Sequence, residues 1–395
     1  MIAERMKPLL NNNSAIRAMF EEGNRLKALY GEDKVYDFSL GNPNLKAPEA
    51  VKKAIIDILN EEDPVSIHGY MNNAGFPEVR SIIAASLNRR FGTSFKEDNI
   101  LMIVGAASGL NIALKTILNP GDEVITFAPY FVDYGNYVAN YDGKLVVVSP
   151  DTETFQPKLS ELEMKITSRT KAVIINSPHN PTGIIYSEET IKNIAEILRN
   201  KEKEYKTNIV LISDEPYREL VYDGSLVPYI TKYHDNSMVV YSYSKSLSLP
   251  GERIGYLVIP DELKNSREVF TAATIANRIN GSVNAPSLMQ KVIARCVDEP
   301  VDVSFYDRNR KDLYDGLISL GFQCIRPQGA FYLFLKSPEE NEISFCEKAK
   351  KLKILMVPGS SFHCPGYVRL AYCVAHETII NSLPAFKLLA AEYSL

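Results

Sequence analysis

A lysine in a cluster of small hydroxyl residues carries the clearest chemical signal in this chain. Lys245 lies in segment 242–246, SYSKS, directly after the apolar run 239–241, and Arg253 follows eight residues later. A lysine at the end of a strand is most often simply a solvated charge. Here the neighbours are small enough to leave room for a ligand, and an arginine that could bind an anion returns nearby. These are the groups that a lysine needs to form a Schiff base with a phosphorylated aldehyde.

Two more polar groups follow apolar runs. In segment 177–183, SPHNPTG, the prolines could fix Asn180 so that its amide faces an oxygen on a ring, although a rigid turn would use the same residues. In segment 214–217, DEPY, Asp214 could cap the next helix. Alternatively, its carboxylate could hold a pyridine nitrogen protonated and make the ring an electron sink. Tyr217 lies three residues later and could hydrogen-bond a ring hydroxyl.

A third motif could bind phosphate. Segment 105–109, GAASG, follows the apolar run 100–104 and opens a helical pattern. Small residues at a helix N-terminus expose free N–H groups and the positive end of the helix dipole, which suits an anion. The signal is weak alone, because such turns also let a helix pack on a strand. The segment is neither a Walker A loop nor G-x-G-x-x-G, which argues against a nucleotide site.

These motifs need a scaffold that brings them together. Short apolar runs predict strands near 100–104, 123–127, 144–148, 171–176, 208–213, 238–242 and 254–259. Helices are predicted between most of them, at about 107–118, 131–140 and 187–200. Such alternation is typical of an α/β fold with a mainly parallel sheet covered on both faces. Ligands bind beyond the carboxyl ends of the strands in such sheets, so the motifs should meet at one edge.

The pattern changes on both sides of this region. Longer helices are predicted at about 261–278, 286–297 and 302–320, followed by short strands near 330–335, 354–357 and 367–372 and a helix near 376–391. In the N-terminal part, Ser14 could cap a helix that ends near residue 30, a strand is predicted at 35–40, and helices at 48–60 and 77–91. We therefore predict a large domain over 46–285 and a smaller α+β domain made of 1–45 and 286–395.

Composition argues against several functional classes. The 395 residues are 45% hydrophobic, enough for a large core and about two domains. A net charge of −4 and the absence of a long basic run argue against nucleic acid and anionic membranes as partners. No secretory signal or membrane-length apolar stretch is visible, so a cytoplasmic location is expected. The five cysteines and five histidines lack paired spacing, so no disulfide framework or metal site is predicted.

The motifs also occur in a characteristic order: N-P-T-G, D-E-P-Y, S-x-S-K with its later arginine, and Y-V-R-L at 367–370. This ordered set resembles that of the class I and II aminotransferases, the aspartate aminotransferase-like enzymes of fold type I that depend on pyridoxal 5'-phosphate (PLP). The resemblance implies a large domain with a mainly parallel mixed sheet between helices, plus a smaller α+β domain. It also implies a homodimer with shared active sites, in which Tyr70 reaches the phosphate of the neighbouring subunit.

The resemblance assigns catalytic roles to three residues. Lys245 forms the internal aldimine, the Schiff base with PLP, and later moves the α-proton of the substrate. Asp214 pairs with the pyridinium nitrogen, and Tyr217 hydrogen-bonds the ring hydroxyl together with Asn180.

The same resemblance assigns the remaining contacts. Phe131 should stack on the ring face, although the neighbouring Tyr130 could take that role. Arg369 should bind the substrate α-carboxylate, helped by Asn180 and the backbone near Gly41. The phosphate should be held by Gly105, Ala106, Ala107, Ser242, Arg253 and Tyr70.

The sequence therefore predicts a PLP-dependent aminotransferase. It would move an amino group between an L-amino acid and a 2-oxo acid by a ping-pong mechanism through the Lys245 Schiff base. One alternative is a carbon–sulfur β-lyase of the same fold, which shares nearly all of these residues. A ligand-sensing PLP-binding protein is disfavoured, because such sensors follow a DNA-binding helical domain and this sequence opens almost directly with the expected aminotransferase helix. A degenerate PLP-binding protein is disfavoured as well, because Lys245, Asp214, Arg253 and Arg369 are all present. The amino donor is open: some related aspartate aminotransferases read the distal carboxylate with a lysine where this chain has Ala107.

Overall fold

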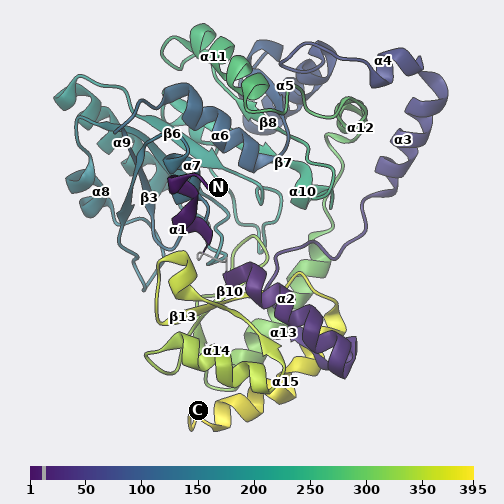
Figure 1. Cartoon of the computed structure of the whole chain (residues 1–395), viewed down its shortest axis with the longest axis vertical. Helices are drawn as coiled ribbons and strands as arrows, with labels where there is room; N and C mark the ends of the chain where they lie inside the picture. The colour runs from purple at the N-terminus through teal and green to yellow at the C-terminus, as the bar shows by residue number, and fades with distance from the viewer. Residues whose placement is uncertain (11–14) are drawn as a thin grey trace.

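Two lobes make up the computed structural model, which describes residues 1–10 and 15–395 (Figure 1). The predicted cap Ser14 lies outside the described residues. The larger lobe contains a seven-stranded sheet with helices on both faces, and the smaller lobe contains the C-terminal strands and helices together with α2 (Ala15–Tyr30). The α/β fold class is confirmed. The domain bounds at 45/46 and 285/286 stay a prediction.

Within the described chain, the large sheet has the strand order β2-β8-β7-β6-β5-β3-β4. Its strands are β2 (Ile100–Ile103), β3 (Glu123–Phe127), β4 (Lys144–Val148), β5 (Thr170–Asn176), β6 (Val210–Asp214), β7 (Ser237–Ser242) and β8 (Gly255–Val258). β8 runs antiparallel to both of its neighbours, whereas the other pairs are parallel. All seven predicted strands are present, and the mainly parallel sheet is confirmed.

Side-chain alternation explains why these strands are nearly continuous apolar runs. In β2, Ile100 and Met102 pack on one face of the sheet, whereas Leu101 and Ile103 pack on the other. Because helices cover both faces, neither set of side chains meets water. One face is covered by α6 (Ala106–Ile117), α7 (Tyr134–Ala139) and α11 (Ser266–Ile279). The other is covered by α5 (Pro77–Phe91), α8 (Leu159–Lys165), α9 (Glu188–Tyr205) and α12 (Ser287–Cys296), and α3 (Glu49–Glu61) packs on α12.

The smaller lobe has its own core around short strands. The described residues include an antiparallel sheet of order β12-β13-β10-β9 and a parallel pair, β1 with β11. The strands are β1 (Tyr36–Asp37), β9 (Gln323–Cys324), β10 (Tyr332–Lys336), β11 (Ile354–Leu355), β12 (Val357–Pro358) and β13 (Tyr367–Ala371). The helices are α13 (Val303–Ser319), α14 (Glu342–Lys351) and α15 (His376–Ala391). Of these, α14 and β9 were not predicted, and the strand expected at 35–40 is only two residues long.

Short elements account for most other differences from the prediction. The unpredicted helices α1 (Lys7–Leu10), α4 (Pro64–His68) and α8 have four to seven residues. α3 and α4 project from the large lobe as an arm (Figure 1). No helix among the described residues is long and apolar enough to cross a membrane.

The sheet register aligns the ends of the strands that carry the motifs. Asn176, the last residue of β5, pairs with Asp214, the last residue of β6, and Asp214 also pairs with Val240 in β7. α10 (Tyr243–Ser246) begins directly after β7. The three motifs that follow these strands therefore meet at the carboxyl edge of the sheet, as expected for a ligand site in an α/β fold.

Candidate active site

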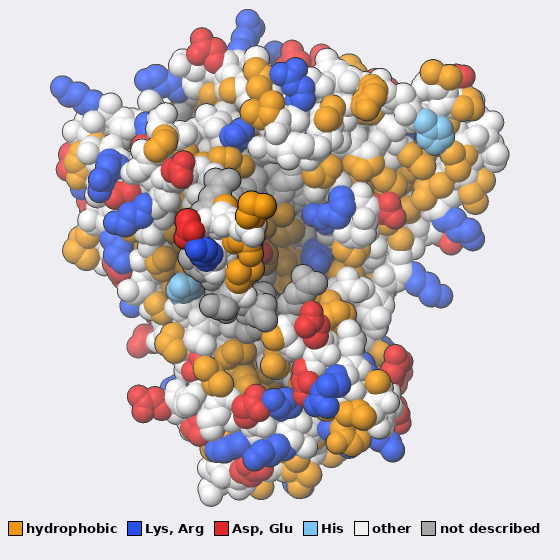
Figure 2. Space-filling view, in the orientation of Figure 1, with side chains coloured by type: hydrophobic (Ala, Val, Ile, Leu, Met, Phe, Trp, Pro, Cys, Tyr) orange, Lys and Arg blue, Asp and Glu red, His pale blue; other side chains and the backbone are white. Residues whose placement is uncertain are grey.

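A cavity of about 280 Å³ lies at this edge of the sheet and is closed on its other side by the small lobe. Figure 2 shows a hollow between the two lobes on the face turned to the viewer. Predicted site residues from both lobes line the cavity: Gly41, Ala106, Ala107, Phe131, Asn180, Asp214, Tyr217, Ser242, Lys245, Arg253 and Arg369. The structure thus brings together eleven of the thirteen predicted site residues. Gly105 lies directly beside Arg253, and Tyr70 lies outside the cavity lining.

Lys245 is presented on the single turn of α10. Ser242 caps this turn, because its hydroxyl accepts a hydrogen bond from the backbone N–H of Ser244. The Lys245 Nζ donates to the backbone carbonyl of Gly41 at 2.8 Å. Burial, helped by the positive charges of Arg253 and Arg369, lowers the pKa of Lys245 to about 8. A larger share of the amine is therefore neutral near physiological pH, as a nucleophile or a general base requires.

Asp214 has one satisfied and one unsatisfied carboxylate oxygen. Its Oδ2 accepts a hydrogen bond from the Tyr134 hydroxyl at 2.7 Å, whereas its buried Oδ1 has no partner among the described residues. Burial raises the pKa of Asp214 to about 7, although the Tyr134 bond acts in the opposite direction. A buried acceptor without a donor is costly, so Oδ1 fits a protonated ring nitrogen. This carboxylate is therefore suited to PLP.

Asn180 is held by contacts with two other strands. Its backbone N–H donates to the Asn176 side chain at 2.8 Å, and the Asn176 amide donates to the backbone carbonyl of Asp214 at 2.7 Å. Its own side-chain oxygen accepts from Arg369 Nη1 at 3.1 Å. These contacts tie the N-P-T-G loop to Asp214 at the end of β6 and to Arg369 of the small lobe.

The glycine and the arginine predicted to bind phosphate are in direct contact. Gly105, at the N-terminus of α6, has a φ of 83°, and a Cβ there would lie 2.4 Å from Arg253 Nη2. Arg253 donates to the backbone carbonyls of Pro250 and Val104 at 3.0 and 3.3 Å, and it has no acidic partner among the residues in view. A guanidinium beside free helix N–H groups is a suitable site for a phosphate dianion. Only glycine gives this close approach.

Arg369, on β13, is a buried cation without an acidic partner in the described part of the chain. It donates to the Ser39 backbone carbonyl at 2.7 Å as well as to Asn180, and its buried Nε has no partner there. Its guanidinium carbon lies 4.6 and 4.8 Å from the ring centres of Tyr332 and Phe362. Burial lowers the pKa of Arg369. Buried charges are normally paired, so this guanidinium is suited to a ligand carboxylate.

The two aromatic candidates for ring stacking occupy different places. Phe131 lines the cavity and contacts Tyr134 edge-on at 5.7 Å between ring centres. Tyr130 is buried and stacks on His363 at 4.6 Å, away from the cavity lining. This placement favours Phe131. Tyr70 is 95% exposed in this chain and lies on the loop after α4.

Two tyrosines of the site were not predicted. Tyr134 holds Asp214, and Tyr332 lines the cavity with its hydroxyl 2.8 Å from that of Tyr217. Tyr134 follows Phe131 by three residues, and Tyr332 ends the run GAFY at 329–332. The available signals were these short distances along the sequence, from Tyr134 to the candidate Phe131 and from Tyr332 to Gly329. Neither residue could be assigned without the fold, because their partners lie 80 and 115 positions away.

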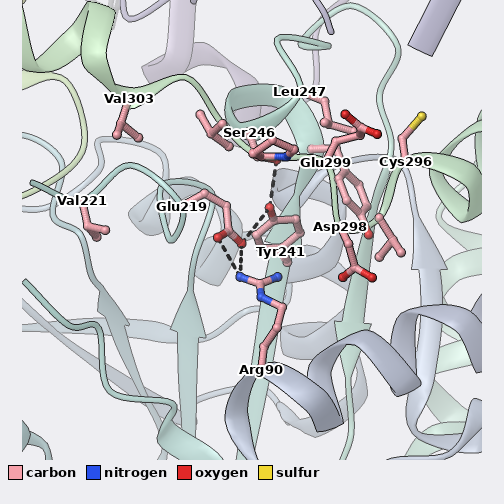
Figure 3. Close-up of a pocket in the computed structure, with 14 residues that line it drawn as sticks. Arg90, Glu219, Val221, Tyr241, Ser246, Leu247, Cys296, Asp298, Glu299 and Val303 are labelled. Carbon is pink, nitrogen blue, oxygen red and sulfur yellow. Dashed lines mark hydrogen bonds and ion pairs between the residues drawn. The ribbon is translucent and has the colours of Figure 1, made fainter. Parts of the chain in front are cut away.

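A second, larger hollow of about 440 Å³ is lined in part by Ser246 of α10 (Figure 3). It contains none of the predicted site residues. In it Arg90 pairs with Glu219 at 2.6 Å, and the Tyr241 hydroxyl donates to Ser246 at 2.8 Å and contacts Glu219 at 3.3 Å. Ser246 is the neighbour of Lys245, so this network holds one end of the turn that carries the lysine.

Comparisons with known proteins agree with this geometry. The family model "Aminotransferase class I and II" matches residues 33–383. An aspartate aminotransferase of Thermotoga maritima is 32% identical over 358 residues, which cover 89% of this chain and 90% of that protein.

Solved structures show the same similarity. The crystal structure of an aminotransferase from Eubacterium rectale has a TM-score of 0.98 at 46% identity and covers 100% of both chains. An aspartate aminotransferase of Thermus thermophilus, solved with maleate, has a TM-score of 0.88 at 27% identity, covering 98% of this chain and 100% of that one. The chain belongs to the class I and II aminotransferases, PLP-dependent transferases of nitrogenous groups with fold type I.

Proposed function

We propose that this enzyme transfers the amino group of an L-amino acid to a 2-oxo acid by a ping-pong mechanism that uses Lys245. The observation that supports this proposal best is the state of two buried groups at one cavity. Asp214 Oδ1 has no donor, and Arg369 has no acidic partner, among the described residues. The first suits the ring nitrogen of PLP and the second suits the α-carboxylate of an amino acid.

Different residues around the cavity would bind different parts of the cofactor. Asp214, Tyr217 and Asn180 would hold the ring nitrogen and hydroxyl, and Phe131 would cover a ring face. The phosphate would be bound by Ser242, Arg253 and the N-terminus of α6, at Gly105, Ala106 and Ala107. When bound, PLP supplies an aldehyde that condenses with amines and a ring that takes up the electron pair released at the substrate α-carbon.

The protein's own groups would then act in sequence. Lys245, with its amine free, would act as the general base at the substrate α-carbon. The lowered pKa of Lys245, about 8, suits this task. Arg369 and Asn180 would hold the α-carboxylate, while Asp214 would keep the ring nitrogen protonated, which lets the ring accept the electron pair. Release of a 2-oxo acid and entry of a second one let the same residues run the steps in reverse.

We also propose that two chains share each active site. Tyr70 is 95% exposed, and the arm that carries it exposes further apolar side chains: Ile56, Leu59 and Val65. Exposed apolar groups on one projecting arm are typical of an interface. In a homodimer, Tyr70 would reach the phosphate in the partner's site.

We propose a reducing, cytoplasmic location for the enzyme. All five cysteines are free, as is typical of proteins in such a compartment.

The substrate proposal remains at the level of an L-amino acid with a free α-carboxylate. The relative in Thermotoga maritima is named an aspartate aminotransferase, and a relative in Aquifex aeolicus is named a probable aspartate/prephenate aminotransferase. Ala107 offers no charge at its place in the cavity lining. An aspartate side chain would therefore need a cation from elsewhere, whereas an apolar or aromatic side chain would not.

Single-turnover absorbance experiments test the proposal. The purified PLP form is mixed with one amino acid at a time, and conversion to the amine form of the cofactor is recorded. A transaminase converts with at least one amino acid and is reset by a 2-oxo acid. A carbon–sulfur β-lyase would instead release pyruvate and ammonia and need no acceptor. If no amino acid converts the cofactor, the transaminase proposal is wrong.

A further inference from the structure

Tyr332 contacts three parts of the cavity that bind different groups. Its hydroxyl oxygen lies 2.8 Å from that of Tyr217, which would bind the ring hydroxyl of the cofactor. Its ring centre lies 4.6 Å from the guanidinium carbon of Arg369, which would bind the substrate carboxylate. Its hydroxyl also touches Gly41, where an added Cβ would lie 2.0 Å away. One buried side chain therefore joins the cofactor side of the cavity to the substrate side.

The register of the small sheet sets this arrangement. β10 and β13 are antiparallel, with Tyr332 opposite Ala371 and Phe334 opposite Arg369. Alternate residues of paired strands share a face, so the Tyr332 ring lies diagonally next to the arginine. A cation over an aromatic face is attracted to it, most strongly where both are shielded from water, and both side chains are at most 3% exposed.

Which of the two tyrosines donates the hydrogen bond follows from the number of protons that they carry. Each phenol carries one proton, and Tyr217 is the hydrogen-bond partner of the Tyr332 hydroxyl among the described residues. If Tyr332 donates, the Tyr217 proton is free to point into the cavity. If Tyr217 donates instead, Tyr332 has a buried proton without an acceptor, and Tyr217 offers the cavity only a lone pair. The positive charge of Arg369 against the Tyr332 ring also favours Tyr332 as the donor.

We propose that Tyr332 is a positioning residue with two effects. Its hydroxyl donates to Tyr217 and so directs the Tyr217 proton toward the ring hydroxyl of the cofactor. Its ring holds the Arg369 guanidinium where it binds the substrate carboxylate. The inference rests on the proposed function, because it concerns how the same site is arranged. A chain of two hydroxyls that donate in the same direction strengthens the second bond, which is the bond to the cofactor.

Three variants separate the two effects. Tyr332→Phe removes the hydroxyl and keeps the ring, Tyr332→Leu removes both, and Tyr372→Phe is the control. The Tyr372 hydroxyl is also buried in the small lobe, where it donates to the Ala330 backbone carbonyl at 3.2 Å, outside the cavity lining. The main measurement is a pH titration of the absorbance of PLP bound to Lys245, which needs no turnover. PLP dissociation constants and the KM of the amino acid complete the set.

The two effects predict different patterns. Tyr332→Phe should raise the apparent pKa of the bound chromophore by roughly half to one unit, because the ring oxyanion loses a well-oriented donor. Its KM should stay near the wild-type value. Tyr332→Leu should show the same titration shift and, in addition, a KM raised about fivefold or more. In a Tyr217→Phe background, Tyr332→Phe should produce no further titration shift, because the pair acts as one unit.

Each effect can fail separately. A Tyr332→Phe protein that titrates like wild type and Tyr372→Phe overturns the directing role. A Tyr332→Leu protein with the KM of Tyr332→Phe overturns the role of the ring. If Tyr332→Leu does not fold, Tyr332→Phe and the Tyr217→Phe background still decide the directing role. Failure of the proposed function looks different, because the wild-type protein itself would then show no absorbance change with amino acids.

Discussion

The Tyr134 hydroxyl donates a 2.7 Å hydrogen bond to Asp214 Oδ2, and the buried Oδ1 is left without a partner among the described residues. Tyr134 is fully buried on α7, and the aspartate ends β6, so the bond joins a helix to the edge of the sheet. It fixes the rotation of the carboxylate and lowers a pKa that burial raises. The tyrosine therefore sets both the orientation and the charge of the carboxylate that we propose as the partner of the ring nitrogen.

Tyr134→Phe should shift the pH dependence of the enzyme upward. Removal of the bond takes away the effect that lowers the pKa of Asp214, so the carboxyl in the free enzyme stays protonated to a higher pH than about 7. PLP binding and kcat/KM should fall about tenfold at pH 7, because a hydrogen bond to a charged group is lost. The acidic limb of both profiles should move to higher pH. Profiles that superimpose on those of the wild type would contradict the role given to Tyr134.

Asp214→Ala should separate catalysis from binding. Without the carboxylate the ring nitrogen would lose its proton and accept the electron pair less well during the reaction, so turnover should fall by a factor of about 100 or more. The dissociation constant of the amino acid should change far less, because Arg369 and Asn180 remain. Stopped-flow absorbance measures both quantities. Near-normal turnover would rule out the electron-sink role of the ring–aspartate pair.

The stability of the cofactor-free protein should fall as pH rises toward and past 7. The folded pKa of Asp214 is about 7, whereas that of an unfolded aspartate is about 3.9. Stability from this group is therefore full below pH 4 and is lost as pH rises through 7, by a few kcal/mol. Asp214→Asn carries no charge, so its apo form should have a higher Tm than wild type at pH 8 and a similar one at pH 4.5. Thermal melts at both pH values test this, and equal Tm differences would contradict it.

Gly41→Ala should damage substrate binding through contact, not backbone strain. The added methyl would lie 2.0 Å from the Tyr332 hydroxyl, and such overpacking costs about 1–3 kcal/mol. Tyr332 must then move away from Tyr217 or Arg369, so the KM of the amino acid should rise. Gly251→Ala is a matched control, because a Cβ at this loop glycine meets nothing within 4 Å. Equal KM values for the two variants would show that the contact has no effect.

Mixed dimers should recover activity that each parent lacks. If Tyr70 serves the partner's site, a dimer of one Lys245→Ala chain and one Tyr70→Ala chain contains one site with both native residues. After random exchange of subunits, about one quarter of wild-type activity should return, because half of the dimers are mixed. Refolding of the two variants together, followed by a rate measurement, tests this. Activity equal to the sum of the separate parents would indicate that sites are not shared.

The strands of the large lobe were predicted well, because their continuous apolar sequences match their burial on both faces of the sheet. Runs such as 238–241 are apolar at every position, which is what a strand covered on both faces requires. The small lobe was predicted less well. Helix α14 has the polar sequence EISFCEKAKK, and its start depends on the Asn341 side chain, which accepts from the N–H groups of Ile343 and Ser344. Such a cap is recognised once the helix is known, and Asn341 alone does not predict it.

The residues of the site also differ in how well the sequence predicts them. Lys245 and Asp214 could be predicted because each follows an apolar strand directly, where α/β sheets bind ligands. Arg369 was found only through the resemblance to a family, because the sequence does not show that this cation is buried without an acid. Tyr134 and Tyr332 act through partners that are distant along the chain. Their roles depend on tertiary contacts that no local pattern contains.

The walls of the cavity come from different lobes: Asp214 of β6 and Lys245 of α10 belong to the large lobe, whereas Tyr332 and Arg369 belong to the small sheet. Catalytic competence is therefore a property of how two cores are held against each other. A low concentration of denaturant that loosens the core of the small lobe should abolish activity while the large lobe is still folded. Circular dichroism should then still show most of the native secondary structure. Inactivation would then precede global unfolding, and early loss of activity would report on the junction between the lobes.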